Sequence, residues 1–301
     1  MNHRRLSRIS WRKVFLVLTA LFSGLGFICG GILWFAGGEL IEPSNHTVGP
    51  PPSGYEIESV KISSDSGSGH NLAGWYMHCA GAEATVVLLH PNRSDRRSMM
   101  NRAKLLHANG FSTLLVDLQG HGESPGEHIT AGFLESRDVR AAVDYVRNRN
   151  PEHRIGIIGR SLGGAAAILA SPIHVDVLIL ESVYPTIQEA IHNRVAMRLG
   201  GLSRIITPIL VAQLKPRLGI SPARLRPVDS IGAMGCPVVI ASGDRDEHTT
   251  LAETQRLFDA AAEPKRLVIF VGAAHEDLLS FDPLKYNEII QFMNTHLTGT
   301  Q

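Results

Sequence analysis

The stretch IGIIGRSLGGA spans residues 155–165 and combines a short apolar run, a tight turn and a series of small residues. Ser161 lies at the centre of the turn, and Gly159 and Gly163 flank it in a G-x-S-x-G pattern. A nucleophile on a sharp strand-to-helix turn needs small residues two positions before and after it, because strand and helix pass closely there. The turn also places Ser161 at a helix N-terminus, where free backbone N–H groups favour developing negative charge. The stretch therefore predicts a serine nucleophile.

The composition limits the possible classes of function. The chain has 301 residues, of which 44% are hydrophobic and 19% charged, with a formal net charge of +1. This length suffices for one large α/β domain and an additional segment. The small net charge gives no electrostatic reason to expect nucleic acid as a partner. Because the 14 histidines are scattered and no C-x-x-C or H-E-x-x-H motif occurs, we expect neither a metal site nor a cofactor.

The N-terminal segment has the features of a membrane anchor. Residues 1–13 form a basic tail, and residues 14–36 are apolar without a charge. A helix over 14–36 would be roughly 30 Å long, which matches the hydrocarbon core of a bilayer. Since Glu39 and Glu42 follow the run, the positive-inside rule predicts a cytoplasmic N-terminus and an extracytoplasmic remainder. The alternative is a cleaved signal peptide, whose apolar core is normally about 7–15 residues long.

Two further expectations concern the same region. Residues 37–54 are rich in proline and are expected to form an extended, semi-rigid linker that holds the following domain off the membrane. Gly26 and Gly30 fit the G-x-x-x-G pattern, through which two transmembrane helices could dimerise.

Residues 55–298 alternate between apolar strands and helices. Besides the strand that opens the 155–165 stretch, the expected strands occupy residues 55–62, 72–77, 85–89, 111–116, 175–180, 237–241 and 267–271. The expected helices occupy residues 103–108, 134–148 and 286–296. This alternation predicts a doubly wound, mostly parallel α/β sheet, in which ligands bind at the carboxyl ends of the strands.

Four chemistry-bearing residues each follow an expected strand, so we expect them at one edge of the sheet: Asn92, Ser161, Asp246 and His275. With these residues the sequence resembles the serine-hydrolase branch of the α/β-hydrolase superfamily over roughly residues 55–298. The resemblance rests on motifs in the family's order, namely His90-Pro91-Asn92, the turn DLQGHGES over 117–124, the elbow at Ser161, and the Asp246 and His275 loops.

The resemblance implies a catalytic triad. Ser161 would be the nucleophile, His275 the general base, and Asp246 the acid that orients the imidazole. Asp244 and Glu181 are alternative acids, and the family's spacing from the glycine at position 243 selects Asp246.

An oxyanion hole would need two backbone donors. The resemblance implies the N–H of Leu162, the residue after the nucleophile, as one of them. Pro91 has no N–H, so the N–H of Asn92 is the first candidate for the other donor and that of Arg93 the second.

An insertion at about residues 185–235 corresponds to the cap of this superfamily. Within it, residues 202–212 are strongly apolar but interrupted by Pro208. They could form a lid whose apolar side lines a hydrophobic pocket, or a helix packed on the core. Four arginines near the expected site could favour an anionic substrate, although solvated surface charge is the simpler interpretation. They are Arg93, Arg96, Arg97 and Arg160.

The sequence thus predicts a membrane-anchored serine hydrolase that cleaves an ester, thioester or amide through an acyl-enzyme. Its substrate would be a small molecule, a lipid or another acylated compound. Carboxylester hydrolysis is the commonest reaction on this scaffold, and peptidase, thioesterase and acyltransferase activities use the same residues. The alternative from another class is a non-catalytic, membrane-anchored binding module with a hydrolase fold.

Overall fold

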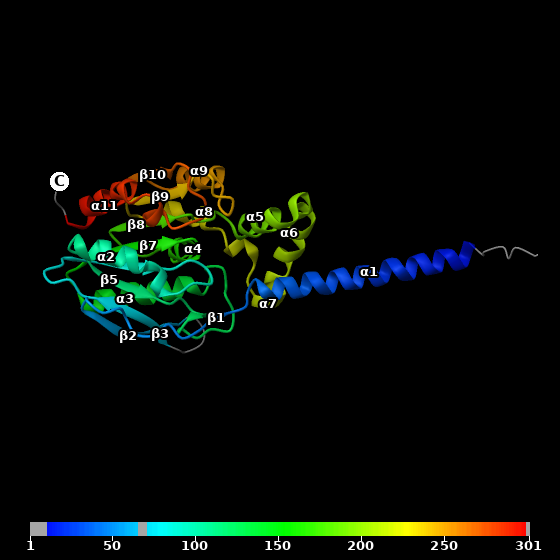
Figure 1. The fold of residues 1–301 in the computed structure, drawn as a ribbon, viewed down its shortest axis with the longest axis horizontal. Helices are drawn as coiled ribbons and strands as arrows, with labels where there is room; N and C mark the ends of the chain where they lie inside the picture. Colours follow the sequence, from blue (N-terminus) through cyan, green and yellow to red (C-terminus); the bar gives the residue numbers. More distant parts are fainter. Residues whose placement is uncertain (1–10, 66–70, 299–301) are drawn as a thin grey trace, which may run out of the picture. The chain divides into compact units, whose positions relative to one another are not determined.

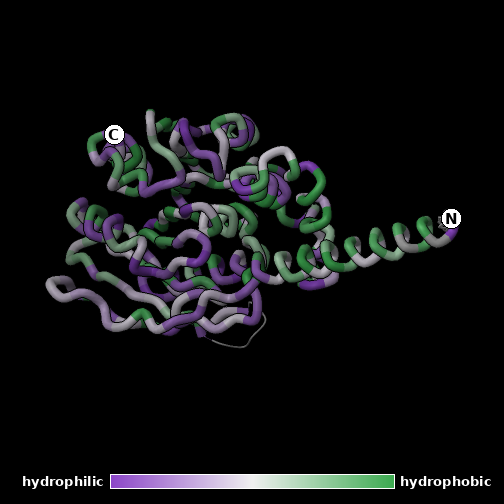
Figure 2. The backbone as a smooth tube through the Cα atoms, turned by 45° about the vertical axis from the view of Figure 1, so that its right-hand side comes forward, coloured by the Kyte–Doolittle hydropathy of each residue, from purple (hydrophilic) through white to green (hydrophobic). Residues whose placement is uncertain are grey.

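The computed structural model describes residues 11–65 and 71–298, and the chain divides into two units at Leu40 and Ile41 (Figure 1). The first unit consists of helix α1 (Trp11–Glu39), along which hydrophobic residues predominate (Figure 2). This helix is long and apolar enough to cross a bilayer. It includes the predicted anchor at 14–36 together with Gly26 and Gly30, whereas residues 1–10 of the predicted basic tail lie outside the described residues.

The second unit is built on an eight-stranded sheet in the order β10-β9-β8-β7-β4-β5-β3-β2. Its strands are β2 (Ile57–Ser63), β3 (Asn71–Met77), β4 (Ala84–Leu89), β5 (Ser112–Val116), β7 (Arg154–Arg160), β8 (Val177–Glu181), β9 (Val238–Gly243) and β10 (Lys265–Phe270). Strand β3 is antiparallel to β2 and β5, and the other pairs are parallel. The prediction of a mostly parallel α/β sheet is confirmed.

Helices cover both faces of this sheet (Figure 1). They are α2 (Met100–Ala108), α3 (Glu135–Arg149), α4 (Leu162–Leu169), α9 (Leu251–Ala260), the short α10 (Leu278–Phe281) and α11 (Pro283–Leu297). Buried side chains of α2 and α11 share one hydrophobic cluster with strand residues such as Val86 and Ile158. Because side chains alternate along a strand, the neighbouring Val87 and Ile157 point to the other face, where α3 and α4 pack.

The segment 37–54 differs from the expected linker. Helix α1 continues to Glu39, and the short strand β1 (Ser44–Asn45) pairs in parallel with β6 (His121–Gly122). Ile41 and Val48 are both buried. The prolines in this segment have no N–H group to donate. The N–H of Ser44, however, donates to the Gly120 carbonyl at 2.7 Å. Most of this segment therefore belongs to the second unit and is not a free spacer.

The predicted cap range contains several short helices. They are α5 (Ile187–Leu199), α6 (Ser203–Ala212), α7 (Leu214–Leu218) and α8 (Pro227–Ser230), with 3-10 turns at η2 (Gly200–Leu202), η3 (Pro222–Arg224) and η4 (Ile231–Ala233). A further 3-10 turn, η1 (Arg96–Met99), lies outside this range and precedes α2. The stretch Ile187–Leu218 also meets the length and composition of a membrane span, but here it is divided among three helices. In α6, Thr207 and Leu210 are buried, whereas Ile205 and Ile209 are exposed. The strongly apolar side of α6 is therefore turned outward.

Candidate active site

The turn between β7 and α4 holds Ser161 in a strained conformation. Its φ of +47° and ψ of −110° lie in a region that non-glycine residues rarely adopt. The N–H of Ser161 donates to the carbonyl of Glu181 at the end of β8 (2.8 Å), and its own carbonyl accepts from the N–H of Ala165 (3.0 Å). The backbone on both sides of the serine is thus fixed by neighbouring elements, and the side chain is 3% exposed.

The flanking glycines are required by backbone contacts. A Cβ at Gly159 would lie 2.6 Å from the Cα of Gly164, and a Cβ at Gly163 would lie 2.5 Å from the carbonyl oxygen of Leu89. Neither neighbour is a flexible side chain that could move aside. The predicted reason for the G-x-S-x-G spacing, a close approach of strand and helix, is therefore visible in the structure.

An acid and a histidine meet in the loops after β9 and β10. The Nδ1 of His275 lies 2.7 Å from Oδ2 of Asp246, and Oδ1 of Asp246 accepts the N–H groups of His248 (2.8 Å) and Thr249 (2.9 Å). Burial alone would raise the pKa of Asp246, but the hydrogen bond and charge of His275 and the Thr249 N–H outweigh it and lower that pKa. The carboxylate therefore stays ionised and can hold the imidazole with its proton on Nδ1, which leaves Nε2 as the reactive nitrogen.

The two alternative acids have other partners. Oδ1 of Asp244 accepts the N–H of Gly272 at 2.6 Å, and so supports the loop that leads to His275. Both carboxylate oxygens of Glu181 are bound by Arg102, at 2.8 and 2.5 Å. Of the three acids considered from the sequence, the structure brings Asp246 to the histidine.

Ser161 and His275 follow β7 and β10, which end at the same edge of the sheet. Within the described residues no hydrogen bond joins Ser161 Oγ to His275, and such catalytic bonds often form fully only when substrate binds. Arg160 links the two loops instead, because it donates to the carbonyl of Glu276 at 3.1 Å and pairs with Asp277 at 3.2 Å.

The candidate oxyanion donors lie at two loop positions. Leu162 is the first residue of α4, so its N–H is among those that the helix itself leaves unpaired. Asn92 follows β4, and its side-chain Oδ1 lies 3.3 Å from Nε2 of His121. The loop before it is held by His90, whose Nδ1 donates to the Pro91 carbonyl at 2.8 Å and whose Nε2 accepts the N–H of Leu118 at 3.0 Å.

Two of the four arginines expected to be solvated are instead ion-paired, one of them buried and the other half-buried. Arg96 is 2% exposed, and its guanidinium pairs with Asp117 and Glu123 of the 117–124 turn and stacks on Trp75 at 4.7 Å. The side chain of Arg160 is 15% exposed and is also ion-paired. The surface interpretation of these two residues is wrong, because their acidic partners are distant in sequence.

Sequence reasoning missed one residue beside the triad. The ring of His248 stacks on that of His275, with centroids 4.6 Å apart and an interplanar angle of 29°. Burial first, and then the nearby charge of His275, lower the pKa of His248. It lies two positions after Asp246, but no motif pointed to it.

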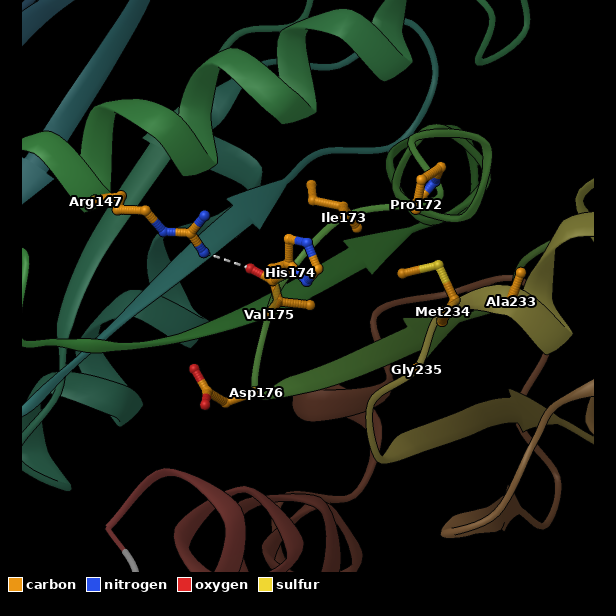
Figure 3. Close-up of a pocket in the computed structure, with 9 residues that line it drawn as sticks. All are labelled: Arg147, Pro172, Ile173, His174, Val175, Asp176, Ala233, Met234 and Gly235. Carbon is orange, nitrogen blue, oxygen red and sulfur yellow. Dashed lines mark hydrogen bonds between the residues drawn. The ribbon is translucent and has the colours of Figure 1, made fainter.

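A pocket of about 410 Å³ lies away from these residues (Figure 3). It is lined by residues 172–176, which precede β8, and 233–235, which precede β9, with Arg147 donating to the His174 carbonyl at 2.7 Å. It therefore lies at the amino ends of the strands, at the opposite edge from Ser161. Across residues 11–65 and 71–298, no group of three or more His, Cys, Asp or Glu side chains is placed to hold a metal ion.

This sheet, with a serine elbow and an acid–histidine pair at its carboxyl edge, has the α/β-hydrolase fold. A family model described as serine aminopeptidase, S33, matches residues 80–227. The uncharacterized protein Rv2307c of Mycobacterium tuberculosis is 29% identical over 240 residues, which cover 77% of this chain and 78% of that protein.

Solved structures agree with this fold. The Pyrococcus furiosus esterase Pf2001 superposes with a TM-score of 0.68 at 21% identity and covers 85% of this chain and 99% of its own. The acylaminoacyl peptidase of Pyrococcus horikoshii gives a TM-score of 0.64 at 15% identity, covering 83% of this chain and 43% of its own. At these identities the likeness concerns the fold.

Proposed function

We propose that this protein is a serine hydrolase whose triad is Ser161, His275 and Asp246. The observation that carries the proposal is the 2.7 Å hydrogen bond between His275 Nδ1 and a buried, ionised Asp246, at the sheet edge where Ser161 is held in a strained turn. A strained backbone at a serine, beside an oriented imidazole, is the arrangement that nucleophilic catalysis requires.

The geometry supports an acyl-transfer mechanism. Ser161 Oγ attacks the substrate carbonyl carbon while His275 Nε2 takes its proton, and Asp246 stabilises the imidazolium. The N–H groups of Leu162 and Asn92 would stabilise the oxyanion. His275 then protonates the leaving group, and a water molecule, deprotonated by the same imidazole, hydrolyses the acyl-enzyme and restores Ser161.

For the substrate we propose a carboxylester, with thioesters and amides as alternatives. One structural neighbour is named an esterase, another an acylaminoacyl peptidase, and the matching family model is described as a serine aminopeptidase. The same residues can serve all three bonds. We further propose that α1 anchors the protein in a membrane with the hydrolase unit on the extracytoplasmic side, on the basis of its apolar length and of the charges that flank it.

A fluorophosphonate probe tests this function without knowledge of the substrate. The full-length protein should be labelled, Ser161→Ala should not, and Asp246→Asn should lower the labelling rate and p-nitrophenyl ester hydrolysis by on the order of 10⁴-fold. Asp244→Asn is the matched control: it changes a neighbouring aspartate whose carboxylate accepts the Gly272 N–H, whereas His275 bonds Asp246, and it should retain most of the activity.

Two outcomes would contradict the proposal. Folded wild-type protein that is not labelled would favour the non-catalytic binding module. A larger loss in Asp244→Asn than in Asp246→Asn would mean that the acid is assigned to the wrong aspartate.

A further inference from the structure

A cluster of ion-paired side chains, partly buried, adjoins the serine turn and the His275 loop. We call it the Arg160 cluster, and it comprises Arg102, Arg160, Glu181, Asp277 and Tyr286. Arg102 donates to both carboxylate oxygens of Glu181 and to Asp277 at 2.6 Å, and the Tyr286 hydroxyl donates to Glu181 at 2.6 Å. Arg160 Nη1 lies 3.2 Å from Asp277, and its Nε lies 3.6 Å from Glu181.

The cluster connects the backbone segments that carry the nucleophile and the base. Arg160 immediately precedes Ser161, and the carbonyl of Glu181 accepts the N–H of Ser161 at 2.8 Å. Asp277 lies two positions after His275, and the carbonyl of the intervening Glu276 accepts from Arg160 at 3.1 Å. The same side chains therefore fix the serine turn and the histidine loop to one another.

The charges in this cluster balance. Two guanidinium groups face two carboxylates, and burial together with Glu181 raises the pKa of Tyr286 well above its usual value, so that the phenol stays neutral and donates. Arg102, Glu181 and Tyr286 are at most 1% exposed. Buried ion pairs of this kind contribute little net stability compared with apolar packing, but they fix geometry.

We propose that Arg160 is a positioning residue that holds the His275 loop against the serine turn, and so aligns the base with the nucleophile. This inference rests on the proposed triad. In the part of the chain that the structure describes, no hydrogen bond joins Ser161 Oγ to His275, so their alignment depends on what links their loops. Arg160 is the side chain that reaches from one loop to two successive residues of the other.

The experiment compares Arg160→Met and Arg160→Lys in the full-length protein. Misplacement of a catalytic group by about 1 Å costs on the order of 100-fold in rate, so Arg160→Met should lower the fluorophosphonate labelling rate and kcat about 10- to 100-fold, with KM little changed. Arg160→Lys keeps the charge and should recover part of this loss. The control is Arg154→Met, at the other end of β7, where the arginine donates to the His296 carbonyl at 2.9 Å; its labelling rate should equal that of the wild type.

A pH profile separates positioning from a merely structural role. Arg160→Met leaves one uncompensated negative charge in the cluster, which stabilises the imidazolium of His275 and shifts the acid limb of kcat/KM to higher pH. The double variant Arg160→Met, Asp277→Asn restores the charge balance. The acid limb of kcat/KM should therefore return to its wild-type pH, while kcat stays low. The other charged or titratable groups near His275 and its stacked neighbour His248 are unchanged in all variants. They are Asp246, Glu247, Glu276 and, from the cap, Arg194.

The results that would overturn the proposal are specific. Folded Arg160→Met with the wild-type labelling rate would show that Arg160 does not position the loop. If Arg160→Met does not fold, Arg160→Lys decides, and an unchanged kcat in that variant refutes the role. A wild-type protein that is not labelled refutes the triad itself, which distinguishes the failure of the proposed function from the failure of this inference.

Discussion

His90 shows how a single buried side chain can make the loop after β4 sensitive to pH. It is fully buried between the loop after β4 and the turn after β5, with Nδ1 donating to Pro91 and Nε2 accepting from the Leu118 N–H. The pKa of His90 is lowered from 6.5 to about 3, mainly because the ring is buried and secondly because His121 is nearby. Protonation of Nε2 would place its N–H opposite the N–H of Leu118, which now donates to it, so the ring is held neutral.

This pKa shift predicts acid sensitivity. Between about pH 6.5 and 3 the unfolded chain binds a proton at His90 that the folded chain does not. The free energy of unfolding therefore falls as the pH falls through this window, by up to about 1.4 kcal/mol per pH unit. Urea unfolding at a series of pH values should show a smaller slope for His90→Gln than for the wild type. Equal slopes would mean that His90 is not held neutral.

At the scale of elements, the serine turn depends on the close contact of β7 and α4 with β4. Gly163→Ala would place a Cβ 2.5 Å from the Leu89 carbonyl oxygen, and backbone must move to relieve it. We expect a loss of about 1–3 kcal/mol in unfolding free energy, together with loss of fluorophosphonate labelling. Gly201→Ala in the cap is the control, because nothing lies within 4 Å of its added Cβ. Equal stability of the two variants would contradict a tightly packed turn.

The sheet could be predicted from the sequence because its signals are local. Continuous apolar runs such as that of β4 are typical of strands covered on both faces, and the glycine spacing around Ser161 reports the contact of neighbouring elements. The family's spacing from Gly243 selects Asp246 as the acid of the triad. The structure adds the hydrogen bond between Asp246 and His275, whereas Asp244 and Glu181 have other partners.

What could not be predicted depends on partners far away in sequence. From the sequence alone, Arg160 and Arg96 resemble surface charges. The fold brings Asp277 to Arg160 and Asp117 to Arg96, and no sequence pattern predicts these pairs. The segment 37–54 was misjudged for the same reason. Its prolines suggested a free linker, whereas the backbone groups that remain between them pair with β6, which lies more than seventy residues further along the chain.

At the scale of the whole molecule, the proposed anchor and the hydrolase unit follow each other with almost no spacer. Helix α1 ends at Glu39, and Ile41, two residues further on, is already buried in the second unit. The boundary between the proposed anchor and the second unit therefore falls near residue 40, and the proline-rich segment after it forms part of the second unit.

Two truncations test this boundary. A chain that begins at Ile41 should leave the membrane fraction without detergent, fold, and react with the fluorophosphonate at the rate of the full-length protein. A chain that begins at Tyr55 loses the β1–β6 pairing and the buried Ile41 and Val48, and because each such side chain contributes about 1.5–3 kcal/mol, its unfolding free energy should fall by several kcal/mol. Equal unfolding free energies of the two truncations would mean that residues 37–54 are a free linker, as the sequence predicted. If the full-length protein already left the membrane fraction without detergent, α1 would not be an anchor. If residues 1–36 were absent from the mature protein, α1 would belong to a cleaved signal peptide.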